Sequence, residues 1–575
     1  MIIVGINAYH PDASVALLRD GEVIWAAEEE RYSRIKHASG FPKLALRKCL
    51  EDTKTLPSAI DAVAISKNPR ANMFKKMSFV WRQKPNIGFV LNRLKAFRKS
   101  SGFERDFFEA LNISLATLKA KFVHVEHHIA HVASSFYFSG YERAAFLSLD
   151  GLGDFSSAMW GVGRGNELRV SGRVYFPHSA GFLYSAATQF LGFHHFGDEY
   201  KVMGLAAYGK ARFKNEIGKM VRLLPAGKFG LDLDYFVHQE GQSKVRWEGG
   251  APEQDIMFSK KWEDIFGPAR EPKTELTERD KDIAASTQEV LEEIYFHVLR
   301  NLYEQCGEKN LCLAGGVAFN SVANGKIKKE TPFENIYIQP AAGDAGTAVG
   351  AAAFVYRTET LNPRTSVMNH AYFGSAAGTT EIEKAMRAKD VGAESCSDAE
   401  LIRRTVDALA AGKVVGWFQG RMEFGPRALG ARSILVDPRR PEMKDILNER
   451  IKRRETFRPF APAVIEEEAA NYFDMDVGSS PFMLMVFPVK EDKKTLLPAI
   501  THVDGTARVQ TVSRESHPRF WSLIKAFGDK TGVPILLNTS FNENEPIVCS
   551  AADALDCYLK TRMEVLVMEN YYLEK

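Results

Sequence analysis

The sequence lacks the features that would assign the chain to several special classes. Its six cysteines form no Cys-x-x-Cys pair and are too sparse for a disulfide framework, which indicates a reducing compartment. No apolar run approaches the ~20 residues needed to span a bilayer, and the chain begins without a basic leader. We therefore expect a cytoplasmic protein with no membrane partner.

The chain also lacks an excess of charge of one sign. The 75 Lys and Arg residues nearly balance the 72 Asp and Glu residues, which leaves a net charge of +3. A molecule of this kind has no overall field to hold it on a polyanion, so we expect no nucleic-acid partner. The 575 residues contain no short repeat or low-complexity tract, and this length suits roughly two to four globular domains.

The most informative feature that is present is the pair of histidines at the ends of residues 127–131. In a helix, His127 and His131 would project from one face about a turn apart, as two ligands of one ion must. The alternative is a pair of surface or core histidines. Asp150 and Asp344 each stand beside glycine and favour the metal site, because two imidazoles and two carboxylates suit Fe(II), Mn or Zn.

Strand and helix patterns predict an α/β fold with an internal duplication. A strand at 2–8, a hairpin at 14–28 that turns at Asp20-Gly21 and a strand near 62–66 precede the histidine helix. The later segments repeat this order, with strands at 144–149, 158–161 and 168–175 and strand-loop-helix units at 311–328 and 336–356. Such a doubled unit is the architecture of actin-like and sugar-kinase ATPases.

The domain boundaries follow from composition. We expect an actin-like domain over 1–356, a mixed polar junction over 357–400 and a second α/β domain over 401–575. The strand candidates of the second domain are 414–418, 433–436, 460–464, 534–537 and 565–569.

Paired glycines mark two candidate ligand loops. Gly315 and Gly316 end a predicted strand just before Asn320. Residues 340–347 form a second glycine-containing loop of this kind, which includes Asp344. Glycine lets a ligand approach the backbone, and a helix N-terminus attracts phosphate. Either loop alone is also compatible with a structural turn, but two of them favour a binding site.

The C-terminal half concentrates cations among glycines. Residues 420–433 carry three arginines, 452–460 carry four more cations, and 504–508 and 538–542 add another arginine with hydroxyl and amide groups. Guanidinium groups bind carboxylate and phosphate oxygens at two points, so this pattern predicts a polyphosphate or acyl-phosphate ligand. A solvated basic surface is the alternative, which the density of Gly, Pro and aromatic residues disfavours.

Residues 70–105 mix Lys and Arg with Phe and Trp. Such a segment could bind nucleic acid, a membrane face or an acidic acceptor. The alternative, which the balanced total charge favours, is a set of helices with a solvated basic face and a packed aromatic face.

Taken together, these strings resemble the O-carbamoyltransferase family of antibiotic and nodulation-factor biosynthesis, which includes a tobramycin carbamoyltransferase. The matching segments cover nearly the whole chain: 28–37, 127–131, 199–209, 315–316, 343–344 and the four C-terminal segments. The resemblance implies an N-terminal domain similar to the threonylcarbamoyl transferase of tRNA modification, and a C-terminal domain similar to threonylcarbamoyl-adenylate synthase.

The implied activity is ATP-dependent. Carbamoyl phosphate and ATP would give carbamoyl-adenylate, and the carbamoyl group would pass to a hydroxyl of a small-molecule acceptor, a sugar or secondary metabolite. The implied cofactors are ATP with Mg(II) and a divalent metal at the His/Asp site, Fe(II) ahead of Mn or Zn, and a homodimer stays open. The rival interpretations are threonylcarbamoyl transfer to tRNA and a non-catalytic actin-like ATP-binding protein.

The resemblance also implies roles for individual residues. The metal ligands would be His127, His131, Asp150 and Asp344. Contacts to substrate and nucleotide would come from Gly315, Gly316, Asn320, Arg421, Arg427, Arg432, Lys452, Arg458, Arg508, Asn538 and Ser540. His10 and Lys36 are the catalytic candidates, although the family usually has His directly before Asp-Ala-Ser. Here Pro11 intervenes and, by fixing φ near ~−65°, is expected to displace His10.

Overall fold

The computed structural model describes residues 1–575 except 84–101, 115–117, 241–244, 247–250 and 363–365. The chain forms two compact units, Met1–Met368 and Asn369–Lys575. The division falls inside the segment 357–400 that the sequence predicts as a junction, and residues 369–400 are part of the second unit.

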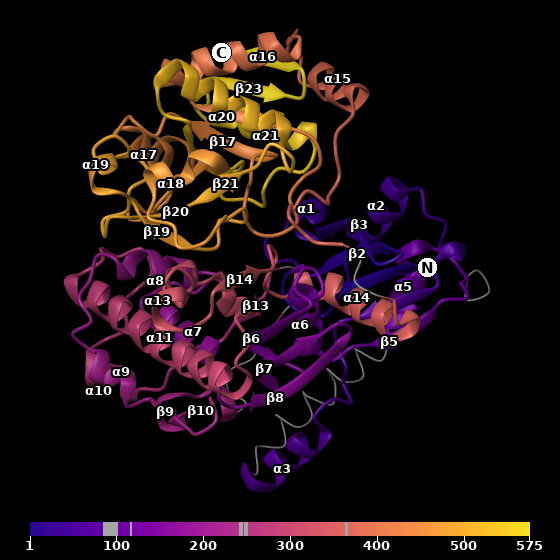
Figure 1. Ribbon diagram of the computed structural model, residues 1–575, viewed down its shortest axis with the longest axis vertical. Coiled ribbons are helices and arrows are strands. Elements are labelled where there is room, and N and C mark those ends of the chain that lie inside the picture. Colours follow the sequence, from indigo (N-terminus) through magenta and orange to yellow (C-terminus); the bar gives the residue numbers. More distant parts are fainter. Residues whose placement is uncertain (84–101, 115–117, 241–244, 247–250, 363–365) are drawn as a thin grey trace. The chain divides into compact units, whose positions relative to one another are not determined.

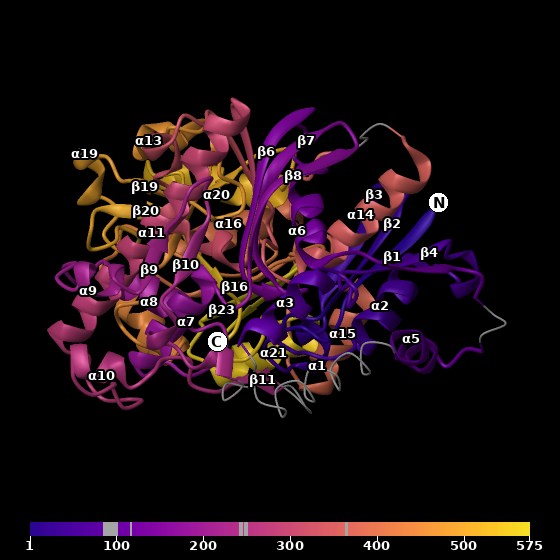
Figure 2. The ribbon, with the colours of Figure 1, turned by 90° about the horizontal axis from the view of Figure 1, so that it is seen from below.

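The first unit contains two five-stranded sheets, and the first of them is built around β1 (Figures 1 and 2). Strand β1 pairs with antiparallel β2 on one side and parallel β4 on the other, and β3 and β5 form the edges. The bounds are β1 Ile2–Asn7, β2 Ser14–Arg19, β3 Glu22–Glu28, β4 Ala62–Ile65 and β5 Lys121–His124. Both Asp20 and Gly21 have positive φ in the β2–β3 turn, as a tight two-residue hairpin requires.

The second sheet has the same topology around β6. Strand β6 pairs with antiparallel β7 and parallel β13, and β8 and β14 form the edges. The bounds are β6 Arg143–Gly153, β7 Ser156–Arg164, β8 Glu167–Tyr175, β13 Asn310–Ala314 and β14 Asn335–Ile338. The order of strand, hairpin and two parallel strands therefore occurs twice, which confirms the predicted actin-like duplication.

Two helices at equivalent places of the two repeats pack against each other. Helix α6 (His127–Phe136) follows β5, and α14 (Gly346–Thr360) follows β14. Helix α14 packs on β1, β2 and β4, whereas α6 packs on β6 and β13. A Cβ on Gly350 would lie 1.8 Å from the carbonyl oxygen of Ala130, so this glycine is what lets α14 approach α6 so closely.

The described part of the first unit contains further α-helices. They are α1 Glu30–Ser33, α2 Lys43–Thr53, α3 Met73–Gln83, α5 Phe103–Leu111, α7 Ala180–Phe190, α8 Glu199–Ala206, α9 Lys214–Gly218, α10 Lys261–Phe266, α11 Glu278–Cys306, α12 Ser321–Asn324 and α13 Ile327–Glu330. The long helix α11 packs against α7, α8 and α9. It begins at a capping box in which Thr277 and Asp280 satisfy each other's backbone N–H groups.

The second unit is an α/β domain with an eight-stranded mixed sheet, as predicted. The strand order is β15-β24-β23-β16-β17-β22-β18-β21. The bounds are β15 Glu394–Ser395, β16 Val415–Phe418, β17 Arg432–Val436, β18 Ala461–Ile465, β21 Gln510–Val512, β22 Ile535–Ser540, β23 Val565–Met568 and β24 Tyr571–Glu574. Helices α16 (Asp398–Ala410) and α20 (Pro518–Thr531) share one apolar core with the strands, with Trp417 and Phe520 fully buried in it.

The structure contains every strand that the sequence predicts for this unit. In addition it has β15, β21, β24 and a two-stranded sheet of β19 (Val486–Pro488) and β20 (Thr506–Arg508). Over the described residues, the helices are all too short or too polar to cross a membrane.

The contact at Gly350 generates a prediction about stability. Gly350→Ala should lower the melting temperature by several degrees, because the added methyl group must push α14 away from α6 at a cost of about 1–3 kcal/mol. Gly218→Ala is the matched control, since a Cβ there meets nothing within 4 Å, and its melting temperature should stay close to that of the parent protein. Equal melting temperatures for the two variants, measured by calorimetry, would contradict this account of the helix packing.

Candidate metal centre and cationic cluster

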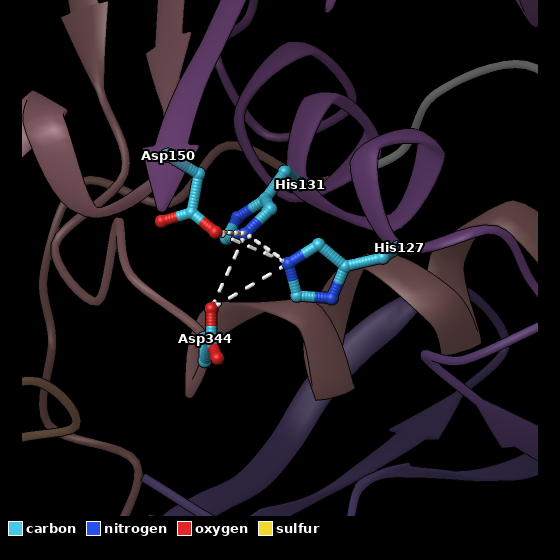
Figure 3. A group of neighbouring side chains, drawn as sticks. All are labelled: His127, His131, Asp150 and Asp344. Carbon is cyan, nitrogen blue, oxygen red and sulfur yellow. Dashed lines mark hydrogen bonds and ion pairs between the residues drawn. The ribbon is translucent and has the colours of Figure 1, made fainter. Parts of the chain in front are cut away.

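Four side chains of the first unit converge on one point (Figure 3). The Nε2 atoms of His127 and His131 are 3.0 Å apart, and each lies 3.4–3.8 Å from a carboxylate oxygen of Asp150 and of Asp344. Donor atoms about 2.1 Å from one ion lie about 3.4 Å apart in a tetrahedral arrangement. The donor types and their spacing therefore fit a divalent metal ion.

The duplicated fold explains why these residues meet. His127 begins α6, where the Glu126 side chain caps the helix by accepting the N–H of Ile129 at 2.9 Å. Asp344 stands just before α14, the equivalent helix of the second repeat. Asp150 lies near the end of β6, the equivalent of β1. The starts of the two equivalent helices thus supply His127 and Asp344, and the close contact of α6 with α14 brings them together.

The pKa values of His127 and His128 in α6 are shifted in opposite directions. Burial disfavours the charged form of His127, but Asp344 and Asp150 outweigh it and raise the pKa of His127 to about 9. Burial and the two neighbouring imidazoles lower the pKa of His128. His128 also lies 2.9 Å from both the Ser148 hydroxyl and the Ser156 carbonyl, so it is a neutral core residue and not a fifth ligand.

The carboxylates are held in their ionised form. Burial acts to raise the pKa of Asp150, but its hydrogen bonds to His127 and His131 outweigh burial and hold the pKa well below its usual range. The N–H of Gly316 also donates to Asp150 Oδ1 at 2.8 Å. The paired-glycine loop therefore orients a candidate ligand, a role that the sequence analysis missed.

Asp154 is a further residue that the sequence analysis missed. Its carboxylate accepts the backbone N–H of His127 at 2.9 Å and that of Asn68 at 2.7 Å, which fixes the first turn of α6. The neighbouring Gly153 is equally constrained, because a Cβ there would lie 2.0 Å from His127 Cδ2. The only signal in the sequence was a second Asp beside the Gly-rich segment 150–154.

His10 reaches the centre despite Pro11. Its Nδ1 lies 3.6 Å from Asp344 Oδ2, and its ring stacks on His127 with centroids 4.9 Å apart. The loop turns around Pro11 because Tyr9 and Asp12 on either side adopt positive φ.

Burial and Lys67 lower the pKa of His10 to about 4, although Asp344 opposes this shift. The other catalytic candidate, Lys36, is exposed. It stands beside His37, whose Nδ1 lies 2.8 Å from Asp12 Oδ1.

Asn320, a predicted nucleotide contact, is engaged within the fold. Its Oδ1 caps α12 by accepting the N–H of Ala323 at 2.9 Å. Its amide pairs with Gln288 through two hydrogen bonds of 2.9 and 3.0 Å. This arrangement favours a structural role, and Asn320 does not figure in the ligand contacts we propose below.

The second unit has a cluster of cations, in which Arg508 and Lys452 have lowered pKa values. Burial, followed by Arg427, Arg454 and Arg458, lowers the pKa of Arg508 well below its usual range. Burial, followed by Arg454, has the same effect on the pKa of Lys452. Cations placed this close together are typical of a polyanion site. The sequence analysis did not single out Arg454 within its basic string.

Neutral polar groups surround Lys452. Its Nζ donates to the backbone and side-chain oxygens of Asn542 at 2.7 Å and to the Ser540 hydroxyl at 3.2 Å. Asn538 is buried on the same strand, β22, and donates to the Gln510 side chain at 2.8 Å. No hydrogen-bond partner for the buried Asn538 Oδ1 occurs among the described residues.

Two of the predicted arginine contacts have structural partners instead. The guanidinium of Arg432 is fully buried, donates to four backbone carbonyls and stacks 3.6 Å above the ring of Phe418. Arg421 donates to the carbonyls of Phe373 and Gly374. Both residues stabilise the loop 420–432, and neither figures in the ligand contacts we propose below.

Comparison with known proteins identifies the family. The model for the carbamoyltransferase N-terminus matches residues 2–353, and the model for the carbamoyltransferase C-terminus matches residues 406–575. The chain belongs to the carbamoyltransferase family. This carbamoyltransferase is therefore an enzyme of the transferase class, as the sequence predicts.

Relatives match along the whole chain. Nodulation protein NolNO of Sinorhizobium fredii is 39% identical over 99% of this carbamoyltransferase and 80% of its own length. An uncharacterized protein of Synechocystis sp. is 39% identical over 100% of this chain and 96% of its own length. Among solved structures, HypF of T. kodakarensis matches 63% of this chain and 48% of its own with 15% identity and a TM-score of 0.31.

The contact of Gly153 with His127 predicts an effect on metal binding. Gly153→Ala should weaken binding of Mn(II) or Zn(II) about 10- to 100-fold, because the methyl group displaces a ligand ring. Gly151→Ala is the matched control, since a Cβ there meets only Phe182 Cε1 at 3.7 Å. Isothermal titration of both variants measures the difference, and equal affinities would contradict a metal-ligand role for His127.

The raised pKa of His127 predicts a pH dependence of metal binding. Below a pKa of about 9 the imidazole is protonated, and an ion must displace that proton. The affinity should therefore rise by about tenfold per pH unit between pH 7 and 9 and level off above. Calorimetry at pH 7.5 in two buffers of different protonation enthalpy should detect release of about one proton per ion, and no release would contradict the electrostatic account.

Proposed function

We propose that this carbamoyltransferase is ATP-dependent and works in two steps, one in each unit. In the second unit, carbamoyl phosphate, ATP and one water would give carbamoyl-adenylate, phosphate and pyrophosphate. In the first unit, the carbamoyl group would pass from the adenylate to a hydroxyl of a small-molecule acceptor, a sugar or a secondary metabolite. The observation that carries the proposal is the cationic cluster around Arg508, which complements the metal centre of the first unit.

Activation suits the chemistry of the cationic cluster. A carbamoyl carbon is a poor electrophile until its oxygen carries a good leaving group, and adenylation supplies one. The charge that develops on the phosphates needs fixed cations, with Mg(II) accompanying ATP. Arg427, Arg454, Arg458 and Arg508 would provide them, and their mutual repulsion would be relieved when a polyanion binds.

Lys452, Asn538 and Ser540 would complete this site. Lys452 is 1% exposed and its Nζ donates to oxygens of Asn542 and Ser540, so it would act by fixing these two residues around the donor. The unpartnered Oδ1 of Asn538 is an acceptor suited to the carbamoyl NH₂ group. Both groups would orient the donor and shield it from water.

The metal centre fits the transfer step. His127, His131, Asp150 and Asp344 would hold Fe(II), or Mn or Zn, and such an ion supplies Lewis acidity and a template for the adenylate without redox turnover. Gly316 would keep Asp150 oriented. Gly315 has a φ of +89°, and a Cβ there would lie 2.4 Å from the Leu149 carbonyl oxygen, so only glycine fits at this point of the loop. The backbone of Gly315 and Gly316 would contact the adenylate.

His10 would accept the proton of the acceptor alcohol. Its Nδ1 faces Asp344, and its Nε2 has no hydrogen-bond partner among the described residues. As the acceptor oxygen bonds to the carbamoyl carbon, the bond from that carbon to the adenylate oxygen breaks and AMP leaves. The alcohol proton would pass to Nε2, which the Asp344 carboxylate stabilises. Lys36 remains a second candidate, for contact with the phosphate.

Transfer of threonylcarbamoyl to tRNA is less well supported. It requires a surface for tRNA, whereas the net charge is only +3. Both family matches also bear the carbamoyltransferase description. A non-catalytic ATP-binding role would leave the metal centre and the cationic cluster without a purpose.

The two steps can be separated by mutation. The metal-loaded protein with carbamoyl phosphate, ATP and Mg(II) should form carbamoyl-adenylate without an acceptor, as detected by mass spectrometry. Arg508→Gln should slow this step by about 100-fold or more, as loss of a fixed donor does, but should retain metal affinity. His127→Ala should show the reverse pattern.

Lys525→Gln is the control, because it removes an exposed cation of the second unit that pairs with Asp529. It should leave both measurements unchanged. Absence of carbamoyl-adenylate from the folded parent protein would overturn the proposed function.

A further inference from the structure

Helix α3 turns an apolar stripe outward. Phe74, Met77 and Trp81 are 89%, 64% and 78% exposed, and Figure 1 places α3 at the lower edge of the first unit. At about 100° per residue, these side chains share an arc of about 120° with the exposed Met73 and Val80. A helix of a globular protein normally buries such a stripe against its core. Helix α3 instead exposes its apolar stripe to solvent.

The opposite side of α3 is anchored to the protein. Phe79 is 8% exposed and packs edge-to-face on Phe155 and Phe176, with centroids 5.8 and 5.1 Å apart. Asn72, just before the helix, donates to the carbonyl of Asp154 at 2.9 Å. The helix is therefore fixed with its apolar stripe pointing away from the aromatic cluster. The packed aromatic face that the sequence analysis favoured is limited here to Phe79.

The chain around α3 carries charge of a single sign. Residues 67–103 include no Asp or Glu. The cations of this segment are Lys67, Arg70, Lys75, Lys76, Arg82, Lys84, Arg93, Lys95, Arg98 and Lys99. In the described part, Arg70 is exposed and Lys76 is half-buried beside the stripe, whereas Lys75 lies on the anchored side with its Nζ 5.2 Å from the centre of the Tyr175 ring. A net charge of +3 for the whole molecule means that this local excess is balanced elsewhere.

We propose that α3 docks on the surface of an anionic lipid bilayer. The Phe, Met and Trp side chains would enter the boundary between headgroups and acyl chains, and the cations would meet the headgroup phosphates. The expectation of no membrane partner rested on the lack of a spanning segment, which docking at a surface does not need. The proposal does not depend on the proposed function.

Other occupants fit the observations less well. Nucleic acid would contact the cations and stack on Phe74 and Trp81 but would leave Met73, Met77 and Val80 in water, since Met and Val offer no stacking surface. A second copy of the chain would bring two all-cationic segments together, and their charges would repel.

Sedimentation of the full-length protein with vesicles tests the proposal. Binding to phosphatidylglycerol vesicles should exceed binding to phosphatidylcholine vesicles by about tenfold or more and should weaken as salt is added. The double substitution Phe74→Ser/Trp81→Ser should reduce binding to the anionic vesicles by about tenfold or more. Arg70→Glu/Lys76→Glu should reduce it as well, and should also remove the preference for anionic lipid.

Leu56→Ser/Leu361→Ser is the matched control. It removes two side chains that are 68% and 76% exposed elsewhere in the same unit, and it should leave vesicle binding unchanged. Circular dichroism establishes that each variant is folded. The proposal is overturned if the parent protein stays in the supernatant, if the Phe74/Trp81 variant binds like the parent, or if that variant instead loses binding to RNA or self-association.

Discussion

The close packing of α6 against α14 is the constraint on which the metal centre depends. Each helix follows the parallel edge of its own sheet, yet α14 packs on the first sheet and α6 on the second. The two repeats are thereby interlocked, and the starts of both helices meet at one point. Gly350 makes this possible, because only a residue without a side chain fits against the Ala130 carbonyl. A wider spacing would separate Asp344 from His127 and His131.

The two units concentrate charged groups of opposite sign. In the first, the buried Asp150, the half-buried Asp344 and two imidazoles share a small volume, and their charges balance only if the imidazoles take up protons or an ion binds. In the second, burial and the cations around Arg508 lower the pKa of that residue. This difference is the basis for the two ligands that we propose, a divalent cation in the first unit and a polyanion in the second. This division agrees with a carbamoyltransferase whose N- and C-terminal family regions coincide with the two units.

Sequence reasoning found the four converging side chains because His127 and His131 stand about one helical turn apart and Asp150 and Asp344 stand beside glycines. It missed the residues that orient them. Asp154 bonds to the His127 N–H from 27 residues away, and Gly316 uses a backbone N–H that no side-chain pattern reveals. For the arginines, the sequence pattern suggested more ligand contacts than we propose. The string 420–433 does not show that Arg432 points into the loop it belongs to, where carbonyls occupy its guanidinium.

The sequence by itself determined the duplicated α/β fold, the family and the pairing of His127 with His131, because strand and helix periodicities and short motifs are local properties. Only the tertiary structure decided that His128 is a neutral core residue, that His10 stacks on His127 in spite of Pro11, and that α3 exposes its aromatic side chains. These outcomes depend on which groups distant in the chain lie opposite each other. Burial and charge at such contacts are set by packing and not by the order of residues along the chain.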